Sequence, residues 1–160
     1  MLLRIILVRV AARRRRDGRA ISGTIGAVSS QAAPSGGLVL HLRAPTLEAL
    51  FTLAAREMYA LAGASAKRSV VLRRPVEVRG EDYATLLLAW LRELLTYTTN
   101  EDRVFYEFAV VSLSPLRLQA QVIGGLREQV ERKLNLELGL EIVIRQTPDG
   151  YETIIPFSAA

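Results

Sequence analysis

The chain has 160 residues, of which 50% are hydrophobic and 23% are charged, and it contains no cysteine. This composition fits one folded domain with a substantial core, and it excludes disulfides, thiolate zinc sites and thiol nucleophiles. No apolar run approaches the ~20 residues that a membrane-spanning helix needs, so we expect a cytoplasmic protein with no membrane contact.

The net charge of +5 is distributed unevenly along the chain. Residues 1–20 hold seven arginines against one acid, Asp17, which gives this segment +6 and leaves the remaining 140 residues at −1. A body so close to neutral argues against a broad nucleic-acid-binding face outside the N-terminal segment.

The first part of the chain predicts strands joined by a charged connector. Predicted strands cover Leu2–Val10, Ala20–Ser30 and Leu38–Leu42. Gln31–Gly37 is typical of a loop. We therefore divide the chain into a basic extension or extra hairpin over residues 1–33 and a domain over residues 34–160.

Two amphipathic helices follow in the sequence. Apolar residues at three- and four-residue spacing predict a helix over residues 46–61, with Thr46 as its N-cap. The same spacing predicts a second helix over residues 82–97, where Asp82 is placed to cap the helix and to favour its dipole. Gly63 is expected to end the first helix.

The second half of the chain is mostly strand-like. Predicted strands cover Val104–Leu113, Leu116–Ile123, Glu141–Gln146 and Tyr151–Phe157, the last two joined by a turn. Leu126–Leu134 is ambiguous, although its periodicity favours an amphipathic helix. Two helices among about six to eight strands indicate an α+β fold, with the helices on one face of a mostly antiparallel sheet.

Few residues offer catalytic or metal-binding chemistry. His41 is the only histidine, and we interpret it as a strand residue rather than a base or ligand, because no acid lies near it before Glu48. The scattered carboxylates are interpreted as surface charges, and Gly124-Gly125 as a turn or bulge. With no nucleophile motif either, we expect no enzymatic activity.

The sharpest feature outside the predicted core is the arginine run of the N-terminal segment. It comprises Arg13, Arg14, Arg15, Arg16 and, three residues later, Arg19. Consecutive arginines make salt-sensitive contacts with the phosphates of nucleic acids. The alternatives are a solvated charge run, an extension without a role, or a segment similar to an organellar transit peptide that lacks the usual serines.

Two blocks of the sequence resemble the archease family. Val76–Ser112 places an alternating strand before a Leu-rich helix with Trp90 and then an aromatic-rich strand, and Thr46–Phe51 opens the preceding helix as TLEALF. Archeases are small proteins that help a GTP-dependent RNA ligase through its activation step in tRNA splicing and RNA repair. The resemblance extends over residues 38–157 and implies an α+β domain with an RNA ligase-type partner. It also implies a loop and then a strand, rather than a helix, over residues 126–134.

The metal site of the family does not carry over to this chain. The resemblance places the family's ligand positions on Pro34, Gly37, Leu138 and Ser158. None of these residues supplies an anionic oxygen, which a divalent cation needs to offset its dehydration. Family members bind a divalent cation such as calcium, whereas we expect no cofactor and no such binding here.

We therefore expect a non-catalytic accessory protein of RNA processing, which binds a partner enzyme and shifts its conformational population. One alternative is an RNA-binding module that acts through the arginine-rich arm. Another is a structural subunit that forms homo-oligomers through exposed strand edges.

Overall fold

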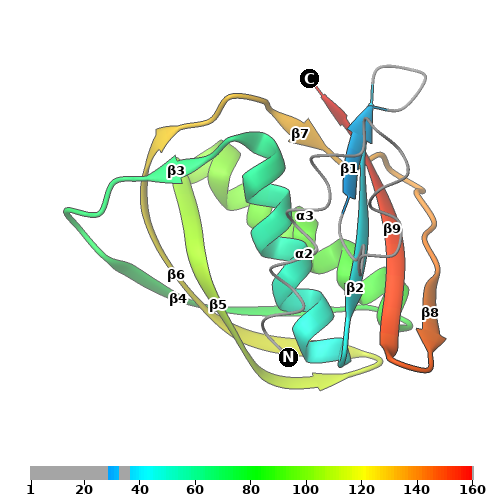
Figure 1. Cartoon of the computed structure of the whole chain (residues 1–160). Coiled ribbons are helices and arrows are strands. Elements are labelled where there is room, and N and C mark those ends of the chain that lie inside the picture. The colour runs from blue at the N-terminus through cyan, green and yellow to red at the C-terminus, as the bar shows by residue number, and fades with distance from the viewer. Residues whose placement is uncertain (1–28, 33–36, 160) are drawn as a thin grey trace.

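The structure, a computed structural model, describes residues 29–32 and 37–159 (Figure 1). The five-stranded sheet contains β1 (Ser29–Ala32), β2 (Leu38–Ala44), β7 (Leu134–Asn135), β8 (Ile144–Thr147) and β9 (Gly150–Ala159). The four-stranded sheet contains β3 (Ser65–Ala66), β4 (Leu72–Arg79), β5 (Arg103–Ser114) and β6 (Arg117–Gln129). The helices are α2 (Leu47–Ala62) and α3 (Tyr83–Glu101).

The two helices pack among the strands of two antiparallel sheets, which confirms the α+β class. α2 contacts β2 of the first sheet and β5 of the second, and α3 packs against the four-stranded sheet (Figure 1). The strands form two sheets rather than the one expected, because β2 pairs with β9 while β4 and β5 both pair with β6.

Both helices begin where the sequence predicts. The Thr46 side chain accepts a hydrogen bond of 3.1 Å from the Ala49 N–H, and Gly63 ends α2 in the left-handed conformation at φ 64°. Asp82 accepts a bond of 2.8 Å from the Thr85 N–H at the start of α3. α3 continues to Glu101, about a turn beyond the prediction, because Thr98 packs into the core although its neighbours are polar.

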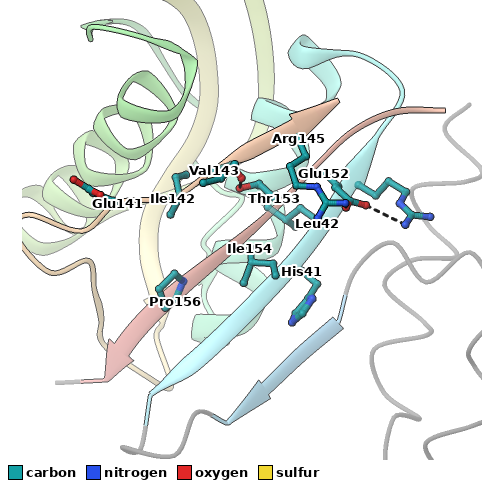
Figure 2. A pocket seen from close by; sticks show the side chains of 11 residues that line it. His41, Leu42, Glu141, Ile142, Val143, Arg145, Glu152, Thr153, Ile154 and Pro156 are labelled. Carbon is teal, nitrogen blue, oxygen red and sulfur yellow. Dashed lines mark hydrogen bonds and ion pairs between the residues drawn. The ribbon is translucent and has the colours of Figure 1, made fainter. Parts of the chain in front are cut away.

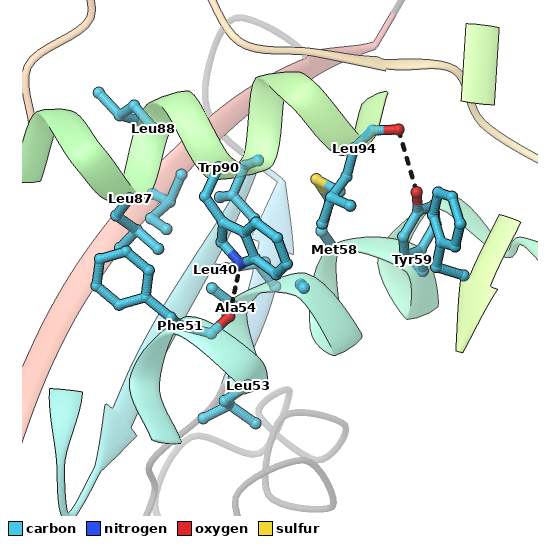
Figure 3. Packing of buried hydrophobic residues seen from close by; sticks show 14 of the residues in the cluster. Leu40, Phe51, Leu53, Ala54, Met58, Tyr59, Leu87, Leu88, Trp90 and Leu94 are labelled. Carbon is cyan, nitrogen blue, oxygen red and sulfur yellow. Dashed lines mark hydrogen bonds between the residues drawn. The ribbon is translucent and has the colours of Figure 1, made fainter. Parts of the chain in front are cut away.

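The core centres on the contact between the two helices (Figure 3). Trp90 is fully buried, and its Nε1–H donates a hydrogen bond of 3.0 Å to the carbonyl oxygen of Phe51. Phe108 of β5 completes the cluster, since its ring stacks on Tyr59 at 6.1 Å and meets Trp90 edge-on at 6.2 Å. The one polar atom of the tryptophan is therefore satisfied inside an apolar environment, as burial requires.

Several strand predictions are confirmed, and the structure differs from two local ones. β5 with β6, and β8 with β9, form the predicted antiparallel pairs. The amphipathic helix favoured for residues 126–134 is replaced by the end of β6, a connector and β7, because residues 126–129 find ladder partners in β3 and β5. Gln31 and Ala32 belong to β1 rather than to a loop.

The Gly124-Gly125 pair lies inside β6 and not in a turn. It adjoins an irregular step of the β5–β6 ladder, where Phe105 pairs with Gly124 but Glu107 pairs with Ile123, in agreement with the bulge interpretation. A Cβ atom on Gly124 would lie 2.1 Å from the carbonyl oxygen of Val104, and one on Gly125 would lie 2.3 Å from that of Lys67. Both residues are therefore glycine because neighbouring backbone approaches β6 closely.

The structure does not describe the predicted strand Leu2–Val10 or residues 20–28 of the predicted return strand. The boundary between the N-terminal extension and the domain, near residue 33, also falls outside the described residues and stays a prediction.

Candidate functional site

The outer face of the five-stranded sheet carries a cleft of about 460 Å³ (Figure 2). Its walls come from β2, β9 and the segment that leads into β8. Its lining residues are His41, Leu42, Arg43, Glu141, Ile142, Val143, Arg145, Glu152, Thr153, Ile154 and Pro156. Alternate residues of β2 and β9 face this side because side chains alternate across a strand, while Leu40 and Ile155 point into the core.

The cleft has a charged end built around Glu152. One carboxylate oxygen of Glu152 lies 3.1 Å from Arg43 Nη2, and the other lies 3.0 Å from Arg145 Nη2. Both arginines are largely exposed, so each pair contributes at most about 1 kcal/mol to stability. His41 lies in β2 opposite Ile154, which confirms the prediction that it is a strand residue.

The rest of the cleft, apart from His41, Glu141 and Thr153, is apolar and partly open to solvent. The exposed fractions of Val143 and Ile154 are 68% and 52%. β8 pairs with β9 up to Thr153 and β7 resumes the pairing at Ser158, so no strand within the described residues covers 154–157 on that side. This combination of an uncovered strand edge, apolar side chains and charges suits binding rather than bond-making chemistry.

A second cavity of about 210 Å³ lies between the last turns of the two helices and the segment before β7. Its buried wall holds the Tyr59 hydroxyl, which lies 2.9 Å from Thr98 Oγ1 and donates to the Leu94 carbonyl at 3.2 Å. Burial raises the pKa of Tyr59 well above its usual value, so the phenol stays neutral at physiological pH.

Basic residues surround the mouth of this second cavity. Arg132 Nη1 donates a hydrogen bond of 2.7 Å to the Leu61 carbonyl, and the Arg132 N–H donates to Ala62 at 2.9 Å. Arg132 therefore satisfies carbonyls that the C-terminal end of α2 leaves open. Arg127 and Lys133 complete the rim.

Two of the positions that the resemblance predicts for the family's metal ligands, Gly37 and Ser158, lie at one corner of the five-stranded sheet. Leu38 pairs with Phe157, so their neighbours Gly37 and Ser158 lie at the same end of the β2–β9 ladder, and Ser158 also pairs with Asn135 of β7. Leu138 follows β7 with 93% of its surface exposed.

The donor set at this corner does not fit a divalent cation. Gly37 offers no side chain, Leu138 an alkyl group and Ser158 a neutral hydroxyl. No group of three or more His, Cys, Asp or Glu residues over 37–159 is placed to hold a metal ion. The absence of cation binding remains a prediction. Pro34 and the arginines Arg13, Arg14, Arg15, Arg16 and Arg19 lie outside the described residues.

Several of the predicted surface carboxylates are exposed, as expected, and also have structural partners. Asp102 bonds to Arg127 at 2.7 Å and Glu101 to Arg74 at 2.6 Å. The backbone N–H and side chain of Thr85 hold the pKa of the Asp82 carboxyl below its usual value. Asp82 lies at the start of α3, and Glu101 and Asp102 lie at its end, so these contacts tie down both ends of the helix.

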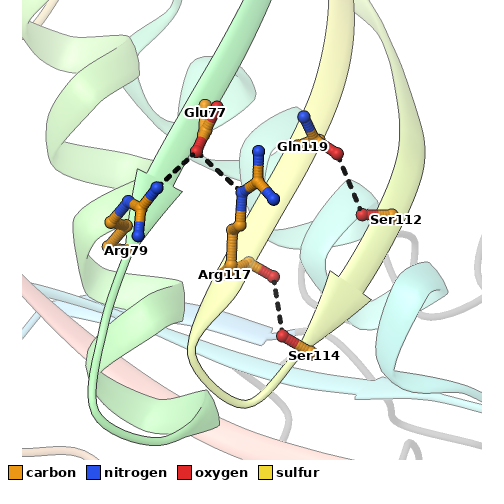
Figure 4. Close-up of polar contacts among 6 residues, drawn as sticks. All are labelled: Glu77, Arg79, Ser112, Ser114, Arg117 and Gln119. Carbon is orange, nitrogen blue, oxygen red and sulfur yellow. Dashed lines mark hydrogen bonds and ion pairs between the residues drawn. The ribbon is translucent and has the colours of Figure 1, made fainter.

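Sequence reasoning missed two polar pairs that join distant positions. The Glu77 carboxylate accepts hydrogen bonds from Arg117 at 2.7 Å and Arg79 at 3.3 Å on the outer face of the four-stranded sheet (Figure 4). The arginines lower the pKa of Glu77, Arg117 more than Arg79. The alternating pattern around Glu77 predicts that its side chain faces outward. No local sequence pattern predicts that Glu77 pairs with Arg117, or that Tyr59 pairs with Thr98.

Residues 37–138 match the model of the Archease protein family, a range that contains both helices and the four-stranded sheet. The chain belongs to the Archease family. Archeases are generally non-catalytic accessory proteins. A search of curated proteins finds no match to this archease. Neither helix in the part of the chain that the structure describes is long and apolar enough to cross a membrane.

Proposed function

We propose that this archease is a non-catalytic accessory protein of RNA processing, located in the cytoplasm. It binds an RNA ligase-type enzyme and stabilises the conformation in which that enzyme becomes activated. The family match over residues 37–138 carries the proposal, because that range holds both helices and most of the buried core around them.

The chemistry of the cleft supports a binding role. Around His41 the cleft offers two arginines, two glutamates and apolar side chains, with Thr153 as its one hydroxyl. The Thr153 hydroxyl is buried and donates to the Val143 carbonyl at 2.8 Å, so it is not presented as a nucleophile. A protein that acts through binding needs no catalytic triad, and its effect is limited by its differential affinity for the two states of its partner.

A guanylylation assay of the partner ligase tests this role. The rate of ligase–GMP formation is measured with and without an equimolar amount of the full chain. We expect stimulation by the native protein and none by the core variant Trp90→Ala. No stimulation at a stoichiometric ratio would contradict the activator role.

The +6 charge of residues 1–20 favours a second candidate, an RNA-binding module that acts through the arginine arm. Deleting these residues and measuring RNA affinity at two salt concentrations tests this candidate. We expect weaker binding and a smaller salt dependence if the arm contacts phosphates. Unchanged affinity after the deletion would remove the arm from consideration.

A further inference from the structure

One end of the four-stranded sheet concentrates positive charge, although residues 37–160 together carry −1. This basic end comprises the β3–β4 loop and the adjoining parts of β4, the start of β5 and residues 126–133. Its basic residues are Lys67, Arg68, Arg73, Arg74, Arg103, Arg127, Arg132 and Lys133, and the acidic residues in or beside it are Glu93, Glu101, Asp102, Glu107, Glu128 and Glu131. Eight basic residues against six acidic ones leave this end with a net positive charge, although the described domain as a whole is near neutral.

Backbone contacts hold the basic end together. The Lys67 N–H donates to the Leu126 carbonyl at 2.8 Å, and Arg103 pairs with Leu126 across the β5–β6 ladder. Gly125 lets the β3–β4 loop lie directly on β6, because any Cβ at this position would collide with the Lys67 carbonyl. The backbone that carries these cationic side chains is therefore held in place.

Most of these cations are not neutralised by neighbours. Ion pairs hold only Arg74, to Glu101, and Arg127, to Asp102. No ion pair with another described residue holds Lys67, Arg68 or Arg73. At the opposite end of the same sheet, by contrast, Glu77 pairs with both Arg79 and Arg117 (Figure 4).

Two arginines of the basic end lie over aromatic rings. The guanidinium carbon of Arg68 lies 3.7 Å from the centre of the Tyr106 ring, and that of Arg74 lies 4.3 Å from the centre of the Tyr97 ring. A guanidinium fixed in this way offers its outer planar face for stacking by a nucleobase. The exposed Val70 and Val71 stand in the same loop and add apolar surface.

We propose that the basic end binds single-stranded RNA. Lys67, Arg73 and Arg103 contact the phosphate backbone around this end of the sheet, while the Arg68–Tyr106 stack receives an unpaired base. This binding is a function of the folded domain, separate from the arginine arm, and it does not depend on ligase activation. An anionic membrane surface would be bound mainly through the exposed valines and would leave the Arg68–Tyr106 stack without a role. The stack therefore favours RNA as the ligand.

Fluorescence anisotropy with a labelled 20-nucleotide oligouridine tests the proposal on the full chain. The variant Lys67→Gln/Arg73→Gln/Arg103→Gln removes three charges from the basic end. We expect its affinity to fall about tenfold or more, and the slope of log K against log salt to decrease by about 2, near 0.7 per lost phosphate contact. The matched control Arg79→Gln/Arg117→Gln/Arg145→Gln removes equal charge elsewhere and should retain the wild-type slope.

The single variant Arg68→Lys tests the stack with little risk to folding. It keeps the charge but loses the planar face, so we expect weaker binding to oligouridine and unchanged binding to inorganic polyphosphate. Equal losses in the two triple variants, or no RNA binding by the wild-type chain, would overturn the proposal. So would binding to vesicles of phosphatidylcholine and phosphatidylserine without binding to RNA. Stimulation of ligase guanylylation by the first triple variant separates this proposal from the accessory role.

Discussion

The helix-packed core of this archease keeps the features expected of the family fold, whereas the corner at the end of β9 lacks the side chains expected of a metal site. In the core, large side chains are fully buried and the polar atoms of Trp90 and Tyr59 have hydrogen-bond partners. At the corner, the positions predicted for metal ligands hold Gly37 and Ser158, and the predicted position after β7 holds an exposed Leu138. The family fold rests on many distributed apolar contacts, whereas a metal site rests on a few anionic oxygens, so the second can be lost while the first is kept.

Truncating the central core residue should have the largest effect. Trp90→Ala removes a fully buried ring and its hydrogen bond to Phe51, and we expect the free energy of unfolding to fall by about 3–5 kcal/mol. Denaturant titration followed by circular dichroism measures this change. Trp90→Phe, which keeps most of the volume, should lose less. Equal losses for the two variants would show that packing at this position matters little.

Removing one buried hydroxyl should cost less. Tyr59→Phe deletes the hydrogen bonds to Thr98 and Leu94 but leaves Thr98 bonded to the Leu94 carbonyl, so we expect a loss of about 1 kcal/mol. The control is Tyr83→Phe, whose hydroxyl has no hydrogen bond with the described residues. A thermal melt that ranks Tyr83→Phe as the more damaging change would contradict the role of the buried pair.

The cap of α3 gives a pH-dependent effect. The pKa of the Asp82 carboxyl is lower in the folded state because Thr85 bonds to the ionised form, so its contribution is present above the unfolded pKa of about 3.9. That contribution is lost as pH falls through the folded pKa. We expect Asp82→Asn to lower Tm at pH 7, and the difference from wild type to shrink below pH ~4. A Tm difference that stays constant down to pH ~2 would rule out the ionised cap.

Changes at the corner should be the mildest. Leu138 is 93% exposed, so Leu138→Ser should change the free energy of unfolding by less than about 0.5 kcal/mol. The same denaturant titration applies, with Trp90→Ala as the contrasting variant. A loss comparable to that of a core residue would show that the corner is part of the packed scaffold.

The elements that the sequence predicted well are those with local signals. The caps at Thr46 and Asp82 and the spacing of apolar residues fixed both helix starts. The helix that periodicity favoured over 126–134 does not form, because pairing with β3 and β5, which lie far away in sequence, overrides the local periodicity. The basic end was missed for a similar reason: its charges come from three separate segments, and a net charge of −1 gave no sign of their clustering.

The most direct test is whether the folded protein binds a divalent cation. Isothermal titration calorimetry of the chelator-treated full chain with calcium measures this. We expect no saturable heat up to millimolar calcium, because the corner at Gly37, Leu138 and Ser158 lacks anionic donors. The same result is expected for magnesium. Saturable binding of calcium with a micromolar Kd would contradict the account.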